Sequence, residues 1–119
     1  MERGTHLVTE SDGGRIAISS EAIAQIVGHV TAESYGVVGS SPRRRGLRRL
    51  SRDRVTRGIA VRSGENGLEI ELTVVVEYGL NLSEVAATVR SRVGYEVTRQ
   101  TGIPVAGVEV RIEDVRRGT

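Results

Sequence analysis

The 119-residue sequence contains no cysteine, phenylalanine or tryptophan, and three tyrosines are its only aromatic residues. The absence of cysteine excludes disulfides and thiolate metal sites and fits a reducing compartment. With so few aromatic residues, aliphatic side chains have to fill the core. No stretch approaches the roughly 18 continuous apolar residues of a membrane-spanning helix, and the N-terminus lacks the apolar core of a signal peptide. We therefore expect a cytoplasmic chain that does not span a bilayer.

The formal charge of +2 hides an uneven distribution. Residues 43–57 hold eight arginines and one acid, Asp53, so this segment carries +7 while the rest of the chain sums to −5. The eight residues are Arg43, Arg44, Arg45, Arg48, Arg49, Arg52, Arg54 and Arg57. They are the candidate residues for binding an anion or a partner.

Apolar spacing predicts two amphipathic helices. The first is capped by Ser19 and ends after Tyr35, where Gly36 follows. The second runs from Asn81 to Gln100 and is stopped by Gly102 and Pro104. The residues expected to be buried are Ile23, Ile26, Val27 and Val30 in the first helix, and Leu82, Val85, Ala86, Val89, Val93 and Val97 in the second.

Alternation of apolar and polar residues predicts strands at 68–78 and 108–112, with a shorter one at 16–18. Tyr78 falls on the inward face of the first of these. Asn66-Gly67 predicts a hairpin turn, which places Arg62 opposite Glu71. The inward residues of the last strand are Val108, Val110 and Ile112.

A sheet with one apolar face and two amphipathic helices buries its core by stacking both helices on that face. We therefore predict an α+β two-layer sandwich, a three- or four-stranded sheet with two helices on one face. The order is βαββαβ if residues 16–18 join the sheet and αββαβ if they do not, and the sequence leaves both open. The predicted organisation is a mobile N-terminal tail at 1–12, one domain at 13–115 with an Arg-rich loop at 42–57, and a C-terminal tail at 116–119.

Catalytic and metal-binding patterns are absent from the sequence. His6 and His29 have no partner at ligand spacing, and Glu69, Glu71 and Glu77 fall on an open sheet face where nothing raises a carboxyl pKa. No phosphate-binding glycine loop or nucleophile elbow occurs. We expect no enzyme activity, no cofactor, no metal site and no small-molecule substrate.

The Arg-rich segment at 42–57 admits two interpretations. Leu47 and Leu50 lie three residues apart, so a short helical turn would show two leucines on one side and arginines elsewhere. Such a segment could bind anionic lipid, RNA phosphates or an acidic protein surface. Alternatively, it is a solvated linker. The sequence does not separate these alternatives.

Four phrases in order carry a family resemblance: G-R-I-A-I-S at 14–19, Y-G-V-V-G at 35–39, V-V-V-E-Y-G at 74–79 and T-G-I-P-V-A-G-V-E-V at 101–110. Over about residues 13–115 the chain resembles the alkaline-shock (general stress) protein family of mainly Gram-positive bacteria. The resemblance implies a non-enzymatic structural or interaction protein linked to stress response and cell-envelope homeostasis. It also implies self-association and attachment to the inner membrane face through a separate anchor protein. The alternative from the residues is an Arg-driven RNA-binding or RNA-associated module.

Overall fold

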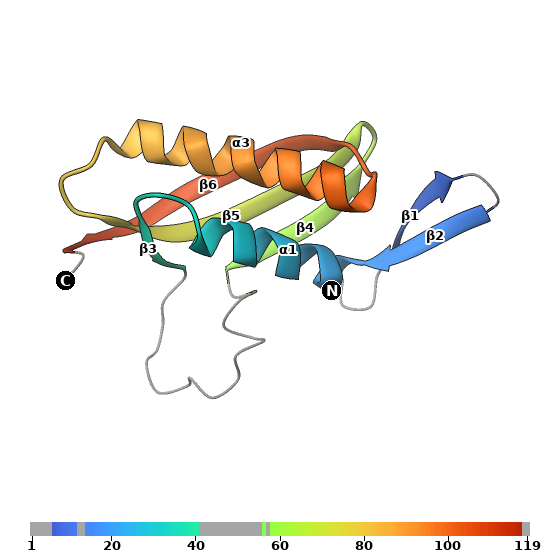
Figure 1. The fold of residues 1–119 in the computed structure, drawn as a ribbon, viewed down its shortest axis with the longest axis horizontal. Helices are drawn as coiled ribbons and strands as arrows, with labels where there is room; N and C mark the ends of the chain where they lie inside the picture. Colours follow the sequence, from blue (N-terminus) through green and yellow to red (C-terminus); the bar gives the residue numbers. More distant parts are fainter. Residues whose placement is uncertain (1–5, 12–13, 41–55, 57, 118–119) are drawn as a thin grey trace, which may run out of the picture.

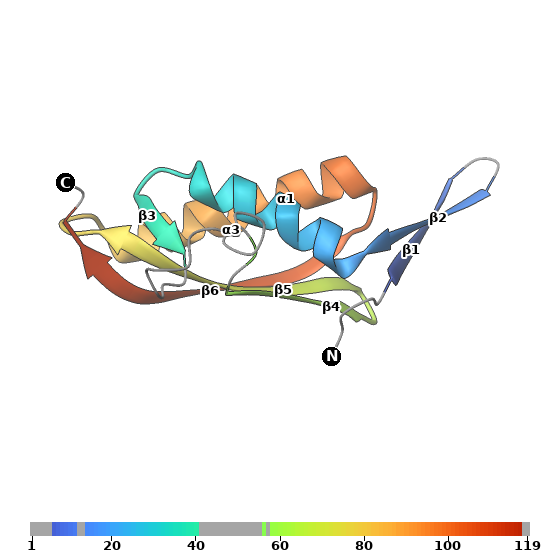
Figure 2. The same cartoon turned by 90° about the horizontal axis from the view of Figure 1, so that it is seen from below.

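The computed structural model describes residues 6–11, 14–40, 56 and 58–117 (Figure 1). Along the chain, the elements are β1 (His6–Ser11), β2 (Gly14–Ser19), α1 (Ser20–Ala32), β3 (Val37–Ser40), β4 (Ile59–Gly64), β5 (Gly67–Glu77), α3 (Leu82–Thr101) and β6 (Val105–Arg116). Both helices lie on the same side of the main sheet (Figure 2). The predicted α+β two-layer sandwich is therefore confirmed.

Strand β5 is the centre of the main sheet. It pairs antiparallel with β3 and β4 and parallel with β6. The amides of Thr73 and Glu77 donate to the carbonyls of Gly58 and Gly36, while the amide of Leu68 donates to Pro104. Odd-numbered β5 residues thus bond toward β3 and β4, and even-numbered ones toward β6. Strands β3 and β4 consequently share one edge of β5, and β6 occupies the other.

The core lies between this sheet and the two helices, and it is aliphatic as predicted. The inward residues of β5 alternate with polar ones except at Val75, because successive side chains of a strand point to opposite faces. The fully buried side chains of the core cluster are Ile23, Val27, Leu68, Ile70, Leu72, Val74, Val76, Val89, Val93 and Val97. Val108, Val110 and Ile112 of β6 pack against this cluster, which confirms their inward orientation.

Strand β2 does not join the main sheet. It pairs antiparallel with β1 in a separate two-stranded sheet, in which Leu7 lies opposite Ile18 and Val8 opposite Ala17. This arm extends beyond the end of the main sheet (Figure 1). His6–Ser11, which fall in the predicted N-terminal tail at 1–12, form strand β1 of this hairpin. Strand β6 continues through Arg116, the first residue of the predicted C-terminal tail.

The β4–β5 hairpin is shifted from its predicted register by two residues. Gly64 pairs with Gly67, so Glu65 and Asn66 form the turn, and Arg62 lies opposite Glu69 instead of Glu71. The residue that decides the position is Gly67, whose φ of +132° and close approach to Pro104 no other residue type tolerates. Because the shift is two residues, every side chain keeps its predicted face.

Both predicted helix caps are confirmed, but the ends of the helices differ in detail. Ser19 accepts a hydrogen bond from the amide of Ala22, and Asn81 accepts one from Glu84. Helix α1 ends at Ala32 rather than after Tyr35. The hydroxyl of Ser34 donates to the Val30 carbonyl at 2.9 Å, an alternative to helix continuation that serine readily offers.

Three apolar residues are more exposed than predicted, and two of them lie at the ends of elements. Tyr78 lies one residue beyond β5 and is 62% exposed instead of inward, and Leu82 opens α3 with 39% of its surface exposed. Ile26 is only partly buried, since it faces the space between the helices. Residues at the ends of elements lack neighbours on one side, so periodicity overestimates their burial.

Candidate interaction surfaces

The arginines predicted to bind an anion or a partner lie outside the described residues. They are Arg43, Arg44, Arg45, Arg48, Arg49, Arg52, Arg54 and Arg57. Their role stays a prediction, and the surfaces described below come from other parts of the chain.

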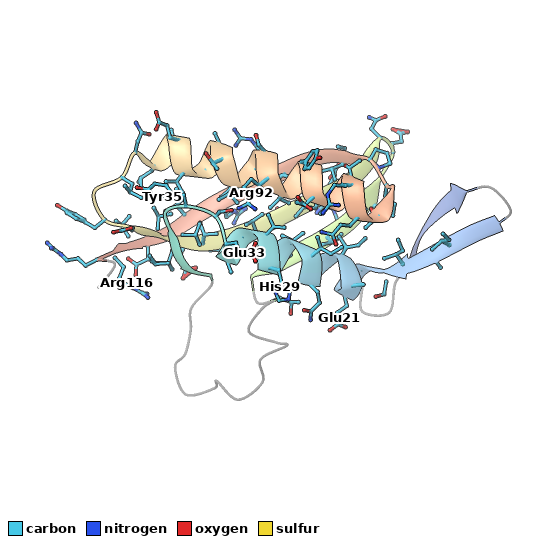
Figure 3. All side chains as sticks on the ribbon, viewed as in Figure 1. Glu21, His29, Glu33, Tyr35, Arg92 and Arg116 are labelled. Carbon is cyan, nitrogen blue, oxygen red and sulfur yellow. The ribbon has the colours of Figure 1, made fainter. Side chains whose placement is uncertain are left out.

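A groove of about 410 Å³ runs between α1 and α3. Ile26 and Val30 form its apolar part, and the remaining lining residues are Gln25, His29, Glu33, Arg92, Glu96, Arg99 and Gln100. His29, Glu33 and Arg92 are labelled in Figure 3 and come from both helices. Gln25, His29 and Glu33 of α1 and its C-cap thus form one wall of the groove.

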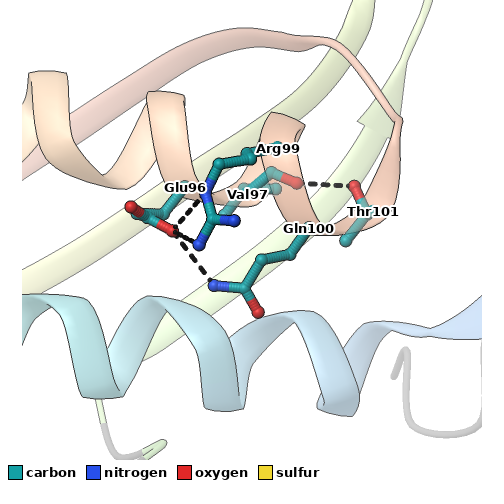
Figure 4. A network of polar contacts seen from close by, with 5 residues as sticks. All are labelled: Glu96, Val97, Arg99, Gln100 and Thr101. Atoms are coloured by element: carbon teal, nitrogen blue, oxygen red, sulfur yellow. Dashed lines mark hydrogen bonds and ion pairs between the residues drawn. The ribbon is translucent and has the colours of Figure 1, made fainter.

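The polar groups on the α3 wall are occupied with one another (Figure 4). The Arg99 guanidinium donates to Glu96 Oε1 through Nη2 at 2.7 Å and Nε at 3.1 Å, and Gln100 Nε2 donates to the same oxygen at 3.2 Å. The hydrogen bond from Arg99 lowers the pKa of Glu96, with a smaller contribution from Gln100. The same ion pair raises the pKa of Arg99. Glu96 is thus held as a carboxylate, which is the opposite of what an acid catalyst at neutral pH requires.

The sheet face opposite the helices carries charged residues in exposed ion pairs. Arg62 Nη2 lies 2.8 Å from Glu69 Oε1, and Arg111 Nε lies 3.3 Å from Glu109 Oε2. The guanidinium of Arg111 also lies 4.0 Å from Glu71 on the neighbouring strand. Pairs so open to solvent contribute little to stability, so this face is available for contacts with other molecules.

All three tyrosines are exposed. Tyr35, Tyr78 and Tyr95 show 74%, 62% and 66% of their surface, and the guanidinium of Arg117 stacks 5.0 Å from the centre of the Tyr78 ring. Tyr35 and Arg116 lie toward the same end of the molecule (Figure 3). Tyr78 was predicted to face inward, so its exposure at this end is a feature that periodicity missed.

The outer edge of β6 is the fourth surface. Among the described residues, β6 pairs only with β5, so its other side has no strand partner. The strand spans 12 residues, Val105–Arg116. Unpaired edges of this length are templates for pairing with another chain.

The sequence of this chain matches a known protein family. A profile of the alkaline-shock protein 23 family, described as having a cell envelope-related function, matches residues 8–117. The chain belongs to this family. The resemblance predicted from the four sequence phrases is therefore confirmed, together with its link to the cell envelope.

Two relatives match over 107 residues each. The uncharacterized protein YloU of Bacillus subtilis is 34% identical, covering 87% of this chain and 89% of its own length. The uncharacterized protein Spy1614 of Streptococcus pyogenes serotype M6 is 28% identical, covering 87% and 88%. Two solved variants of MamM CTD align with a TM-score of 0.49 and 13% identity, over 79% of this chain and 93% of theirs.

Neither the family description nor the names of the relatives assign a catalytic activity. Within the described part of the chain, no three acidic or histidine side chains gather at a spacing that would hold a metal ion. Over the same residues, no helix has the length and apolar character needed to cross a membrane.

Proposed function

We propose that this protein is a non-enzymatic interaction protein that supports cell-envelope homeostasis under stress by self-association and partner binding. The observation that carries the proposal is the free edge of β6, combined with the cell envelope-related function of the family. The polar groups on the α3 side of the groove support it, because Glu96, Arg99 and Gln100 bind one another.

The proposed location is the cytoplasm, at the inner face of the membrane, through a separate membrane-anchored protein. Purified membranes from the native organism should retain the tagged chain. Vesicles made from the extracted lipids alone should retain much less. Equal retention by protein-free vesicles would contradict an anchor protein and indicate direct lipid binding.

Self-association is tested separately by sedimentation equilibrium from micromolar to millimolar protein. The weight-average mass should rise with concentration. A strictly monomeric chain at the highest concentration would contradict the proposal that this protein acts by assembling.

An RNA-binding role is the second candidate, favoured by the exposure of all three tyrosines and by the +7 charge of residues 43–57. Aromatic rings stack on bases, and arginines bind phosphates with an affinity that falls steeply with salt. Replacing Arg43–Arg45, Arg48 and Arg49 with serine should abolish salt-sensitive retention on RNA or anionic vesicles and leave the melting temperature unchanged. Wild-type protein that ignores both at low salt would leave the solvated-linker interpretation of the segment.

A further inference from the structure

We propose that two copies of this chain join through their β6 edges, antiparallel, about a two-fold axis at Val110. The main sheet would then run continuously across the dimer. This inference rests on the proposed self-association and deepens it, since it names the surface and the register that produce it.

The backbone of β6 is oriented for such pairing. Even-numbered β5 residues bond toward β6, and Leu72 lies opposite Val110 in the parallel ladder. In a parallel ladder, every second residue of a strand bonds to the two residues that flank the residue opposite it. The N–H and C=O groups of Val110 therefore point away from β5, into the open edge. The same alternation applies to Val108 and Ile112, because no register shift interrupts this stretch.

Over residues 108–112, this edge lacks two of the features that usually prevent pairing, proline and a bulge. Strand β6 contains no proline, and its register shifts lie outside residues 108–112. Edge strands of natural proteins are normally kept short, interrupted or covered, because free backbone groups recruit other strands. A second copy supplies the missing hydrogen-bond partners without any change of fold.

Side-chain chemistry favours this register over its neighbours. With the axis at Val110, Val110 exchanges both backbone hydrogen bonds with the partner's Val110. On the inner face Val108 lies opposite the partner's Ile112. On the outer face Glu109 lies opposite the partner's Arg111, and the two-fold axis repeats each pair. Apolar residues meet apolar residues, and opposite charges meet.

The neighbouring registers are disfavoured. An axis at residue 109 would place Glu109 opposite the partner's Glu109, and an axis at residue 111 would place Arg111 opposite the partner's Arg111. Like charges directly opposite one another destabilise strand pairs. An axis between two residues would place each residue whose backbone groups point into the open edge opposite a residue whose backbone groups bond β5. Amide groups at the open edge would then lack hydrogen-bond partners.

Disulfide trapping tests the register directly, since the chain contains no cysteine. Opposite residues of a pair without mutual hydrogen bonds lie about 4.5 Å apart at Cα, within disulfide reach, whereas diagonal neighbours lie about 7–8 Å apart. Glu109→Cys protein carrying a size tag should therefore cross-link with untagged Arg111→Cys protein. Either variant alone should cross-link far less.

Charge exchange tests the same contact without oxidation. Glu109→Arg and Arg111→Glu should each weaken self-association by about tenfold or more, because both symmetry-related pairs become repulsive. An equimolar mixture of the two variants should associate about as tightly as the wild type, since each Arg then faces a Glu. The matched control is Arg62→Glu, the same charge change on the same sheet face but on β4, which should leave association unchanged. Equal melting temperatures of the monomers verify that the fold is intact.

The outcomes separate this inference from the proposed function. Wild-type protein that never associates would overturn both. Dimers that form without the mixture-specific cross-link, or that tolerate both charge variants, would overturn the β6 pairing alone. Cross-linking of Glu109→Cys or Arg111→Cys by itself, at the level of the mixture, would overturn the axis at Val110.

Discussion

Replacing Gly67 with alanine should lower the free energy of unfolding by about 2–4 kcal/mol. The φ of Gly67 is +132°, and an added Cβ would lie 2.5 Å from the Pro104 carbonyl oxygen and 3.0 Å from its carbon. Both atoms belong to the backbone, so no side-chain rotation relieves the contact. Backbone strain of this kind costs about 1–3 kcal/mol. Moving Pro104 away would also weaken its 2.9 Å hydrogen bond from Leu68, worth about 1 kcal/mol.

Two other glycines separate the contributions. Gly79 has a φ of +97° but open space around its Cβ position, so Gly79→Ala should show backbone strain without the contact. Gly107 has open space and no positive φ, so Gly107→Ala should be nearly neutral. Urea unfolding at one fixed protein concentration should place the midpoint of Gly67→Ala roughly 1–2 M below that of Gly107→Ala. Coincident midpoints would refute the argument that Pro104 requires glycine at position 67.

Three further perturbations test the helices and the groove. Val89→Asp should prevent folding, because Val89 is completely buried and an unpaired carboxylate there costs several kcal/mol. Ser91 is exposed, so Ser91→Asp should destabilise the protein only mildly. Equal melting temperatures of the two variants by circular dichroism would contradict the packing of α3. Asn81→Ala should cost about 1 kcal/mol in urea unfolding through the lost bond to the Glu84 amide, and an unchanged midpoint would show that the cap is not used. Because the pKa of Glu96 is lowered in the folded state, its stabilisation is complete above the ordinary glutamate pKa and is lost as the pH falls through the folded value. The urea midpoint of Glu96→Gln should therefore fall less than that of the wild type between pH 7 and pH 3, and parallel losses would contradict a role for the pair.

Local chemistry was enough to predict the two helices, the β4–β5 hairpin and β6, together with their faces. At Ser19 and Asn81, a side-chain oxygen accepts a hydrogen bond from the backbone amide three residues further along the chain. The sequence alone supplies this spacing. The inward faces of β5 and α3 follow from alternation and from helical spacing, which do not depend on the partner element. The hairpin arm had a signal as well, since Asp12-Gly13 between two alternating stretches is a typical turn dipeptide.

Contacts between distant residues decided the rest. The position of the β4–β5 turn depends on Gly67 meeting Pro104, 37 residues further along the chain. The turn dipeptide alone therefore placed the turn one residue too far along, which changed the strand register by two. Tyr78 is exposed because β5 ends at Glu77, so the tyrosine lies beyond the strand, where Arg117 stacks on its ring.

By itself, the sequence determined the family, the α+β class and the side of each helix and strand that faces the core, because short-range periodicity encodes them. Only the tertiary structure decided which strand edge remains open. Both edges of β6 are formed by the same residues, so the sequence does not show which edge bonds β5. The crossover through α3 decides this, because it sets how the chain returns to the sheet.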